Sequence, residues 1–277
     1  MTTHLLVPLF ASGALQFAFE KATPEGKTTI CALLILSLFS WTVIITKFRQ
    51  LWIARKWTKR FFAAYNRGHD PLEIQRKTEN FEGAPAYHLY SRGADEVDYH
   101  LKHNPVPVNG QSRISLASFD SVKAVLEEAA AAEAMALEKG MIVLSTAVAG
   151  GPFIGLLGTV WGVMETFAGI ARANAASLTA MAPGVAGALI ATVVGLLVAI
   201  PAMFAYNFMV TSIRAITQEL DAFNTRYATQ LEHGYVDNRP LGQEIKDANE
   251  ALAGRLLDAL RSPEPNLTDE PVFAGDR

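Results

Sequence analysis

Polar side chains that could act on an ion occur at three positions inside otherwise apolar stretches. They are Thr159, Glu165 and Thr192. A threonine hydroxyl both donates and accepts hydrogen bonds, so it can hold water or a carboxyl group inside a membrane. The alternative is local, because membrane threonines commonly bond a carbonyl one turn back on their own helix. Taken as isolated residues, the two threonines are better explained by this local bond.

Glu165 is the one charged residue of its apolar run and lies six residues beyond Thr159. At 1.5 Å per helical residue this is about 9 Å, which places the carboxylate near the outer end of a spanning helix. A set of such carboxylates could gather cations at a pore mouth. The alternative is an interfacial carboxylate that faces water. Our hypothesis is that Glu165 attracts ions without being essential.

The rest of the composition offers no enzyme chemistry. The six histidines lie outside the long apolar runs, and metal-ligand spacing, nucleophile elbow and phosphate loop are absent from the sequence. Cys31, the single cysteine, lies in an apolar run and is expected to be a neutral thiol. A net charge of -3 gives no argument for nucleic acid. We expect a non-enzyme with no cofactor and no metal.

Three stretches are apolar enough to cross a bilayer, which takes about 20 helical residues. They are 28–46, 141–171 and 181–210. A soluble helix would need charges on its exposed face, and a barrel strand would alternate with period two. The sequence therefore predicts an all-α integral membrane protein with three transmembrane helices.

Basic residues set the expected orientation, because Lys and Arg favour the cytoplasmic side. Six of them follow the first stretch, between Lys47 and Arg60. The predicted protein is therefore multi-pass, with its N-terminus on the outer side and its C-terminus cytoplasmic; the family resemblance described below implies a bacterial inner membrane, whose outer side is periplasmic. The segments between the spans are then an N-terminal interfacial or periplasmic segment (1–27), a cytoplasmic helical loop (47–140), a periplasmic link (172–180) and a cytoplasmic helical extension with a tail (211–277).

The segments outside the three spans have their own predicted structures. Residues 1–18 are expected to form a short interfacial helix, and the aromatic-rich basic cluster 55–60 to anchor the chain to lipid head groups rather than bind nucleic acid. Residues 67–109 contain four prolines and indicate short helices and turns. Residues 112–139 are Ala- and Glu-rich and are expected to run into the second span without a break. The third span is expected to continue through 211–231, followed by a last helix to about Leu260 and a disordered tail from Ser262.

The second and third spans carry rows of small residues, unlike the bulky first span. Such rows let helix backbones approach closely in lipid. The predicted packing residues are Gly155, Gly158 and Gly162 in one span and Gly184, Gly187 and Gly195 in the other. Because one three-helix chain would offer too few partners for both rows, we expect a homo-oligomer. Pro152 and Pro201 are expected to shape these helices.

Two motifs in these spans give a family resemblance. Residues 151–167 read GPFIGLLGTVWGVMETF, and residues 182–207 read APGVAGALIATVVGLLVAIPAMFAYN. Together they resemble the paired second and third spans of the MotA/TolQ/ExbB proton channel family, and the three-span layout is closest to ExbB and TolQ. The resemblance covers roughly residues 127–227, and the N-terminal half agrees only in topology.

The resemblance implies a pentameric ring around a dimer of a single-span ExbD/TolR-like subunit that carries an intramembrane Asp. The ring would be the stator of a motor that couples proton-motive force to work on the cell envelope. Thr159 and Thr192 match the pore-lining threonines of the family. One position departs from ExbB and TolQ, which have a glutamate where this chain has Gly187.

That departure leaves rival functions open. A non-conducting scaffold would keep the ring and only hold the partner, and a sodium-driven motor would use the same threonine oxygens. A transporter permease subunit is a weaker rival, because it usually needs more spans and a broken-helix substrate site.

Overall fold

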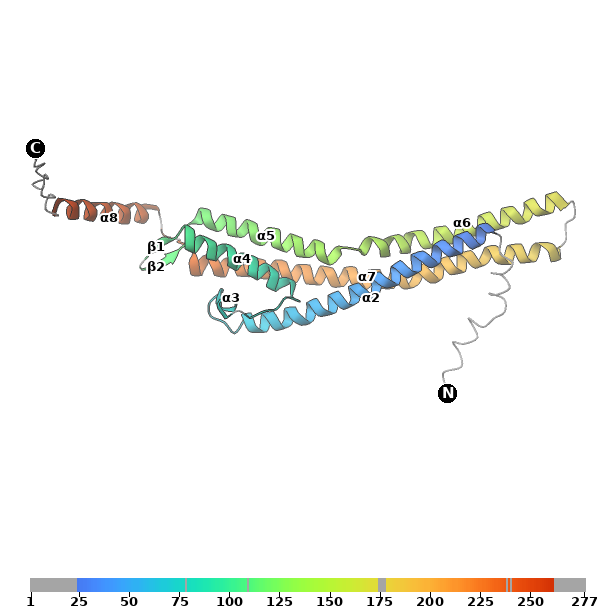
Figure 1. The fold of residues 1–277 in the computed structure, drawn as a ribbon, viewed down its shortest axis with the longest axis horizontal. Coiled ribbons are helices and arrows are strands. Elements are labelled where there is room, and N and C mark those ends of the chain that lie inside the picture. Colours follow the sequence, from blue (N-terminus) through green and yellow to red (C-terminus); the bar gives the residue numbers. More distant parts are fainter. Residues whose placement is uncertain are drawn as a thin grey trace, which may run out of the picture.

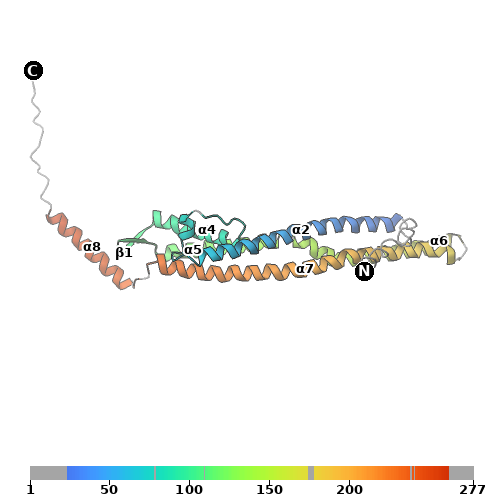
Figure 2. The same cartoon turned by 90° about the horizontal axis from the view of Figure 1, so that it is seen from below.

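The computed structural model describes residues 24–77, 79–108, 110–173, 178–237, 239 and 241–261. They form a long bundle whose main helices run nearly along one axis (Figure 1). The helices are α2 (Pro24–Tyr65), α3 (Glu73–Lys77), α4 (Pro85–His103), α5 (Leu116–Glu138), α6 (Met141–Ala173), α7 (Leu178–Tyr235) and α8 (Leu241–Arg261), and two strands, β1 (Val106–Val108) and β2 (Gln111–Arg113), lie between α4 and α5. Seen from a second side, α7 runs along nearly the whole bundle and α8 lies beyond its end (Figure 2).

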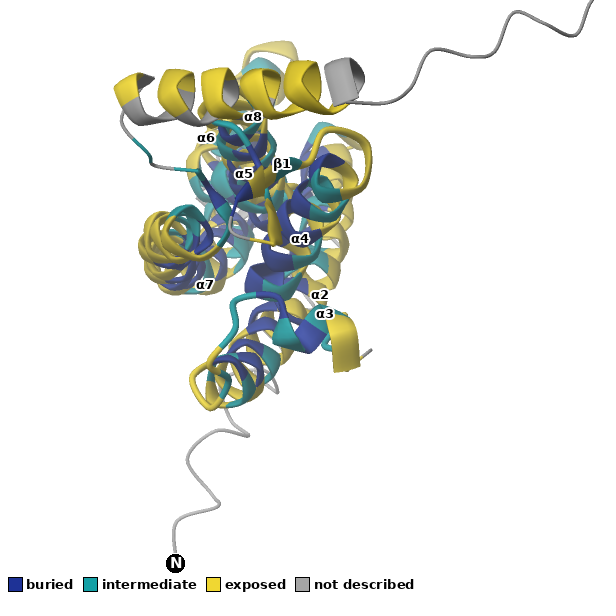
Figure 3. Ribbon diagram, turned by 90° about the vertical axis from the view of Figure 1, so that its left-hand side faces the viewer, coloured by how far each residue is buried: buried dark blue, intermediate teal, exposed yellow. Residues whose placement is uncertain are grey.

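Three segments are long and apolar enough to cross a membrane: Pro24–Tyr65, Leu116–Arg172 and Gly184–Tyr235. They contain the first two predicted spans and all but the first three residues of the third, so the predicted fold class is confirmed, while the exact ends of the spans stay predictions. Large apolar side chains on these helices point away from the bundle, with Leu38 and Phe153 each 71% exposed. Viewed along the bundle, the exposed ribbon lies on the outer face of the helices and the buried ribbon faces inward (Figure 3). An apolar outer face is what lipid contact requires.

Two of the membrane helices continue well beyond their apolar runs. Helix α7 has 58 residues, so it is about 87 Å long, and the predicted continuation of the third span is confirmed. Helix α2 has 42 residues and carries the basic cluster 55–60 on its far half. These two ends join α3, α4, α5 and the strands to form what we call the head, residues 51–138 and 211–237.

The expected unbroken helix from 112 into the second span is wrong at one point. Helix α5 ends at Glu138 and α6 begins at Met141. Lys139 has φ −52° and ψ 127°, and Gly140 has φ +88°. These values match the two central residues of a type II turn, whose second position favours glycine because other residues rarely adopt positive φ. Gly140 is therefore the breaker that the periodicity concealed.

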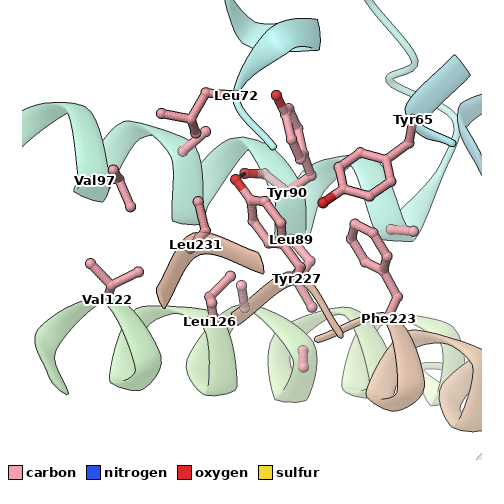
Figure 4. Packing of buried hydrophobic residues seen from close by; sticks show 14 of the residues in the cluster. Tyr65, Leu72, Leu89, Tyr90, Val97, Val122, Leu126, Phe223, Tyr227 and Leu231 are labelled. Carbon is pink, nitrogen blue, oxygen red and sulfur yellow. Dashed lines mark hydrogen bonds between the residues drawn. The ribbon is translucent and has the colours of Figure 1, made fainter. Parts of the chain in front are cut away.

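The core of the head is aromatic. Tyr90 from α4, Phe61 and Tyr65 from α2, and Phe223 and Tyr227 from α7 are all buried within one cluster (Figure 4). The rings of Phe223 and Tyr227 stack with centroids 5.6 Å apart. Aromatic burial on this scale, completed by leucines and valines of α4 and α5, explains why the head packs around the ends of two long membrane helices.

Part of the loop was predicted with too little regular structure. Helix α4 has 19 residues, and β1 and β2 form an antiparallel hairpin with Val106 opposite Arg113. Its turn contains the sequence Asn109–Gly110, and Gly110 has φ +78°. Asn-Gly between short extended runs is a strong hairpin signal that the sequence reading overlooked.

The hairpin also fixes the end of α7. Ile114, next to β2, forms a parallel bridge with Val236 and accepts a hydrogen bond from the Asp237 amide at 3.0 Å. The predicted last helix is present as α8. The predicted interfacial helix at 1–18 and the tail from Ser262 lie outside the described residues.

Candidate functional site

The candidate site lies where α6 and α7 pack against each other through their rows of small residues. A Cβ on Gly155 would lie 2.9 Å from the Ala191 carbonyl oxygen and 3.0 Å from the Thr192 Cα. A Cβ on Gly195 would lie 2.6 Å from the carbonyl oxygen of Gly151. These neighbours are backbone atoms, so the helix axes approach closely only because the positions are glycine.

The same pattern holds along the rest of the interface. A Cβ on Gly162 would lie 2.7 Å from the Ala188 Cβ, and a Cβ on Gly184 would overlap the Thr166 hydroxyl. Gly187 is buried in the same row of α7. The two rows therefore satisfy each other within one chain. Each row therefore has a partner without further copies, and the expected homo-oligomer stays a prediction.

The structure brings the two candidate threonines to one depth. Gly158 faces Ala191, since a Cβ on Gly158 would lie 2.5 Å from the Ala191 Cβ. Thr159 directly follows Gly158, and Thr192 directly follows Ala191. Because the two helices run antiparallel, the threonines lie within about 3 Å of each other along the bundle axis.

Their hydroxyls differ in what they bond. The Thr159 hydroxyl donates to the Leu156 carbonyl at 2.7 Å, which is the local bond weighed from the sequence. The Thr192 hydroxyl oxygen is enclosed and has no hydrogen-bond partner among the residues that the structure describes. An enclosed polar atom without a partner is uncommon, and inside a membrane it marks a position where a polar group can bind. Of the two, Thr192 is the stronger candidate.

Glu165 does not present a free carboxylate. Its Oε1 lies 2.6 Å from Nη2 of Arg172, and the carboxylate side chain is 42% exposed. The Arg172 Nε also donates to the Ala168 carbonyl at 3.2 Å, which holds the guanidinium on the helix. The sequence reading placed Arg172 in the link, but α6 continues to Ala173. A spacing of seven residues, two helical turns, was the signal that would have paired them.

The two prolines lie inside helices that continue through them, Pro152 in α6 and Pro201 in α7. Each removes one backbone donor, which leaves a carbonyl one turn earlier available to another group. Their shaping role stays a prediction.

Sequence reasoning missed the structural role of Lys47, which it counted only as one of the six basic residues that set the orientation. The structure buries this side chain, with 7% of its surface exposed, at the junction of the membrane helices and the head. The sequence signal was its position as the first basic residue after the apolar run.

Metal chemistry has no support in the described ranges. Within them, no group of three or more His, Cys, Asp or Glu side chains is placed to hold a metal ion. The polar groups described above for the membrane helices are the two threonine hydroxyls, backbone carbonyls and the Glu165–Arg172 ion pair.

Comparisons with known proteins agree with this geometry. Residues 101–222 match the model of the MotA/TolQ/ExbB proton channel family. The chain is 31% identical over 220 residues to the Tol-Pal system protein TolQ of Haemophilus influenzae, covering 77% of this chain and 91% of that protein. It is 33% identical over 195 residues to the biopolymer transport protein ExbB of Pseudomonas putida, covering 70% of this chain and 56% of that protein. It is 29% identical over 221 residues to ExbB of Neisseria meningitidis serogroup A, covering 75% of this chain and 92% of that protein.

Proposed function

Because the chain belongs to the MotA/TolQ/ExbB proton channel family, we propose that it is the ring subunit of an ion-driven motor in a bacterial inner membrane. Its multi-pass helical architecture and its channel family support a membrane role and not an enzymatic one. In the proposed complex five copies surround two copies of a single-span ExbD/TolR-like partner that carries an intramembrane Asp. The N-terminus is periplasmic and the head is cytoplasmic, with membrane lipids around the outer face.

The observation that carries the proposal is the unpartnered Thr192 hydroxyl at the depth of Thr159. A partner carboxyl group at this depth could donate to or accept from that hydroxyl in either of its protonation states. The chain supplies no acid of its own at Gly187, which is buried. The titrating group of the motor is therefore assigned to the partner, and the ring supplies hydroxyls and a closely packed wall.

A specific set of observations favours a second candidate, the non-conducting scaffold. The Thr159 hydroxyl is bonded to its own helix, and the Glu165 carboxylate is paired with Arg172. In that case the ring would hold the partner without passing ions. Ion flux through the assembled complex separates the two functions.

The test is proton flux into liposomes that contain the chain together with an ExbD/TolR-like partner. We expect Thr192→Val to reduce flux on the order of tenfold or more, since a hydrogen bond to a charged group is worth about 1.5–3 kcal/mol. Thr146→Val is the control, because Thr146 lies on the neighbouring helix α6 and its hydroxyl only bonds the Ile142 carbonyl at 2.7 Å. Equal flux in all three proteins would contradict the assignment of Thr192, and no flux in the native complex would favour the scaffold. Replacing the proton gradient by a sodium gradient distinguishes the driving ion.

A further inference from the structure

Lys47 is a buried cation at the junction between the membrane helices and the head. Its Nζ donates to the Leu137 carbonyl at 2.9 Å, to the Ala136 carbonyl at 3.3 Å and to the Gln50 side-chain oxygen at 2.8 Å. A buried ammonium is costly unless it is hydrogen-bonded, so these three acceptors are what make the position tolerable.

Two of these acceptors are carbonyls at the end of α5. The last carbonyls of a helix have no partner within it, and a cation near them also interacts favourably with the helix dipole. At this end the Lys139 amide satisfies the Met135 carbonyl at 3.0 Å. Lys47, which comes from α2, satisfies the next two, Ala136 and Leu137. The side chain therefore ties α2 to the point where α5 stops.

Packing around the break leaves space on two sides. A cavity of about 460 Å³ borders it on the α2 side, lined by Gln50, Ala136 and Leu137 among others. A second cavity, of about 410 Å³, borders it on the α7 side, lined by Glu138 and Met141 among others. Both hollows are open at the surface, so side chains cover the break only on its inner side. Leu137 and Met141, one on each side of the break, are buried in one apolar cluster.

We infer that Lys47 is a positioning residue that fixes the angle of the break between α5 and α6. Through that angle it sets the orientation of α5 relative to α6, the helix that carries Thr159. The bend is visible where α5 meets α6 (Figure 1). A motion of the membrane helices then reaches the head through one hydrogen-bonded contact, in addition to the continuous helices α2 and α7. This inference goes beyond the proposed function and does not depend on it.

The test measures the angle as a distance across the break. Spin labels are placed at Glu127→Cys on α5 and Ala149→Cys on α6, both exposed positions, in a Cys31→Ser background. The labelled chain is mixed with an excess of unlabelled chain so that only pairs within one chain are measured by pulsed electron spin resonance. If the two helices were collinear, the label sites would be about 33 Å apart, a distance that pulsed electron spin resonance can measure.

We expect Lys47→Met to widen the distance distribution at least about twofold, because the two α5 carbonyls lose their donor. Lys47→Arg keeps a charged donor, so its distance distribution is expected to be as narrow as that of the native chain. Lys139→Met is the matched control, since it removes an exposed charge beside the break and should leave the width unchanged. A native width in Lys47→Met would overturn the inference. Equal widening in Lys139→Met would do so too, because the effect would then come from charge alone.

A variant that fails to fold would not leave the question open. Amide exchange of residues 223–231 in the aromatic core reports whether the head is intact, independently of the break. If Lys47→Met loses that protection, Lys47→Gln takes its place, because it keeps an amide donor without the charge. An intermediate width is expected for Lys47→Gln, and a width identical to that of the native chain would again count against the inference.

Discussion

Replacing Gly155 by alanine should force α6 and α7 apart at the level of the candidate site. The added Cβ would lie 2.9 Å from the Ala191 carbonyl oxygen and 3.0 Å from the Thr192 Cα, whereas ordinary contacts begin at 3.4 Å. Both neighbours are backbone atoms that no rotamer change can move. The helices must therefore separate locally by about 0.5 Å, and overpacking of this kind costs about 1–3 kcal/mol.

A matched substitution lies five residues away on the same helix. A Cβ on Gly150 would have nothing within 4 Å, so Gly150→Ala should gain up to about 1 kcal/mol from helix propensity. Since Gly155→Ala gains the same helix propensity, the two variants should differ by the overpacking cost alone, about 1–3 kcal/mol in the free energy of unfolding. Unfolding by SDS titration in mixed micelles, followed by circular dichroism, measures this difference.

Exchanging the glycine and the alanine of one contact gives a stricter test. Gly162→Ala would place its Cβ 2.7 Å from the Ala188 Cβ, and Ala188→Gly removes that atom. We expect the double variant to recover most of the stability lost by Gly162→Ala alone. Identical unfolding curves for Gly155→Ala and Gly150→Ala, or no recovery in the swap, would refute the claim that glycines set the α6–α7 distance.

Three further outcomes follow from described contacts. Glu165→Gln should lower ion flux by less than about threefold, because the Glu165 carboxylate is already paired with Arg172. A complete loss of flux with normal partner assembly would show that Glu165 is essential. His88 donates a hydrogen bond to Glu133, and this bond raises the pKa of His88. The bond therefore stabilises the fold fully below about pH 6.5, the ordinary pKa of histidine, and this stabilisation is lost as the pH rises through the raised pKa. Thermal unfolding at a series of pH values should therefore show a weaker loss in Glu133→Gln than in the native chain, and parallel curves would contradict this. Tyr235→Phe removes a hydroxyl that donates to Asp70 at 2.6 Å and should cost about 1 kcal/mol in the same SDS titration, whereas an unchanged midpoint would mean that the contact contributes nothing.

The membrane architecture was predictable because it depends on long runs of one residue class. Uncharged stretches of spanning length leave few structural solutions in lipid, and small residues at three- and four-residue spacing identify the packed faces. The positions of Gly155, Gly162 and Gly195 in the α6–α7 interface follow from that pattern. What pattern alone could not decide was whether the two rows pack on each other or on another copy.

The errors came from single residues that act through tertiary contacts. Gly140 reads as an ordinary helical residue until its positive φ is seen, and Lys47 reads as a surface charge until the α5 carbonyls lie beside it. Arg172 was placed in a link, so its pairing with Glu165 was missed. In each case the local composition was compatible with two structures, and the deciding partner came from a distant segment or from a helix that continued farther than expected.

The proposed motor function depends most directly on the assembly of the complex. The native mass of the chain, purified from membranes after co-expression with a single-span ExbD/TolR-like partner, tests this in one measurement. The account predicts a mass equal to five copies of the 30.0 kDa chain plus two of the partner. A monomer, or a ring that never retains the partner, would contradict it.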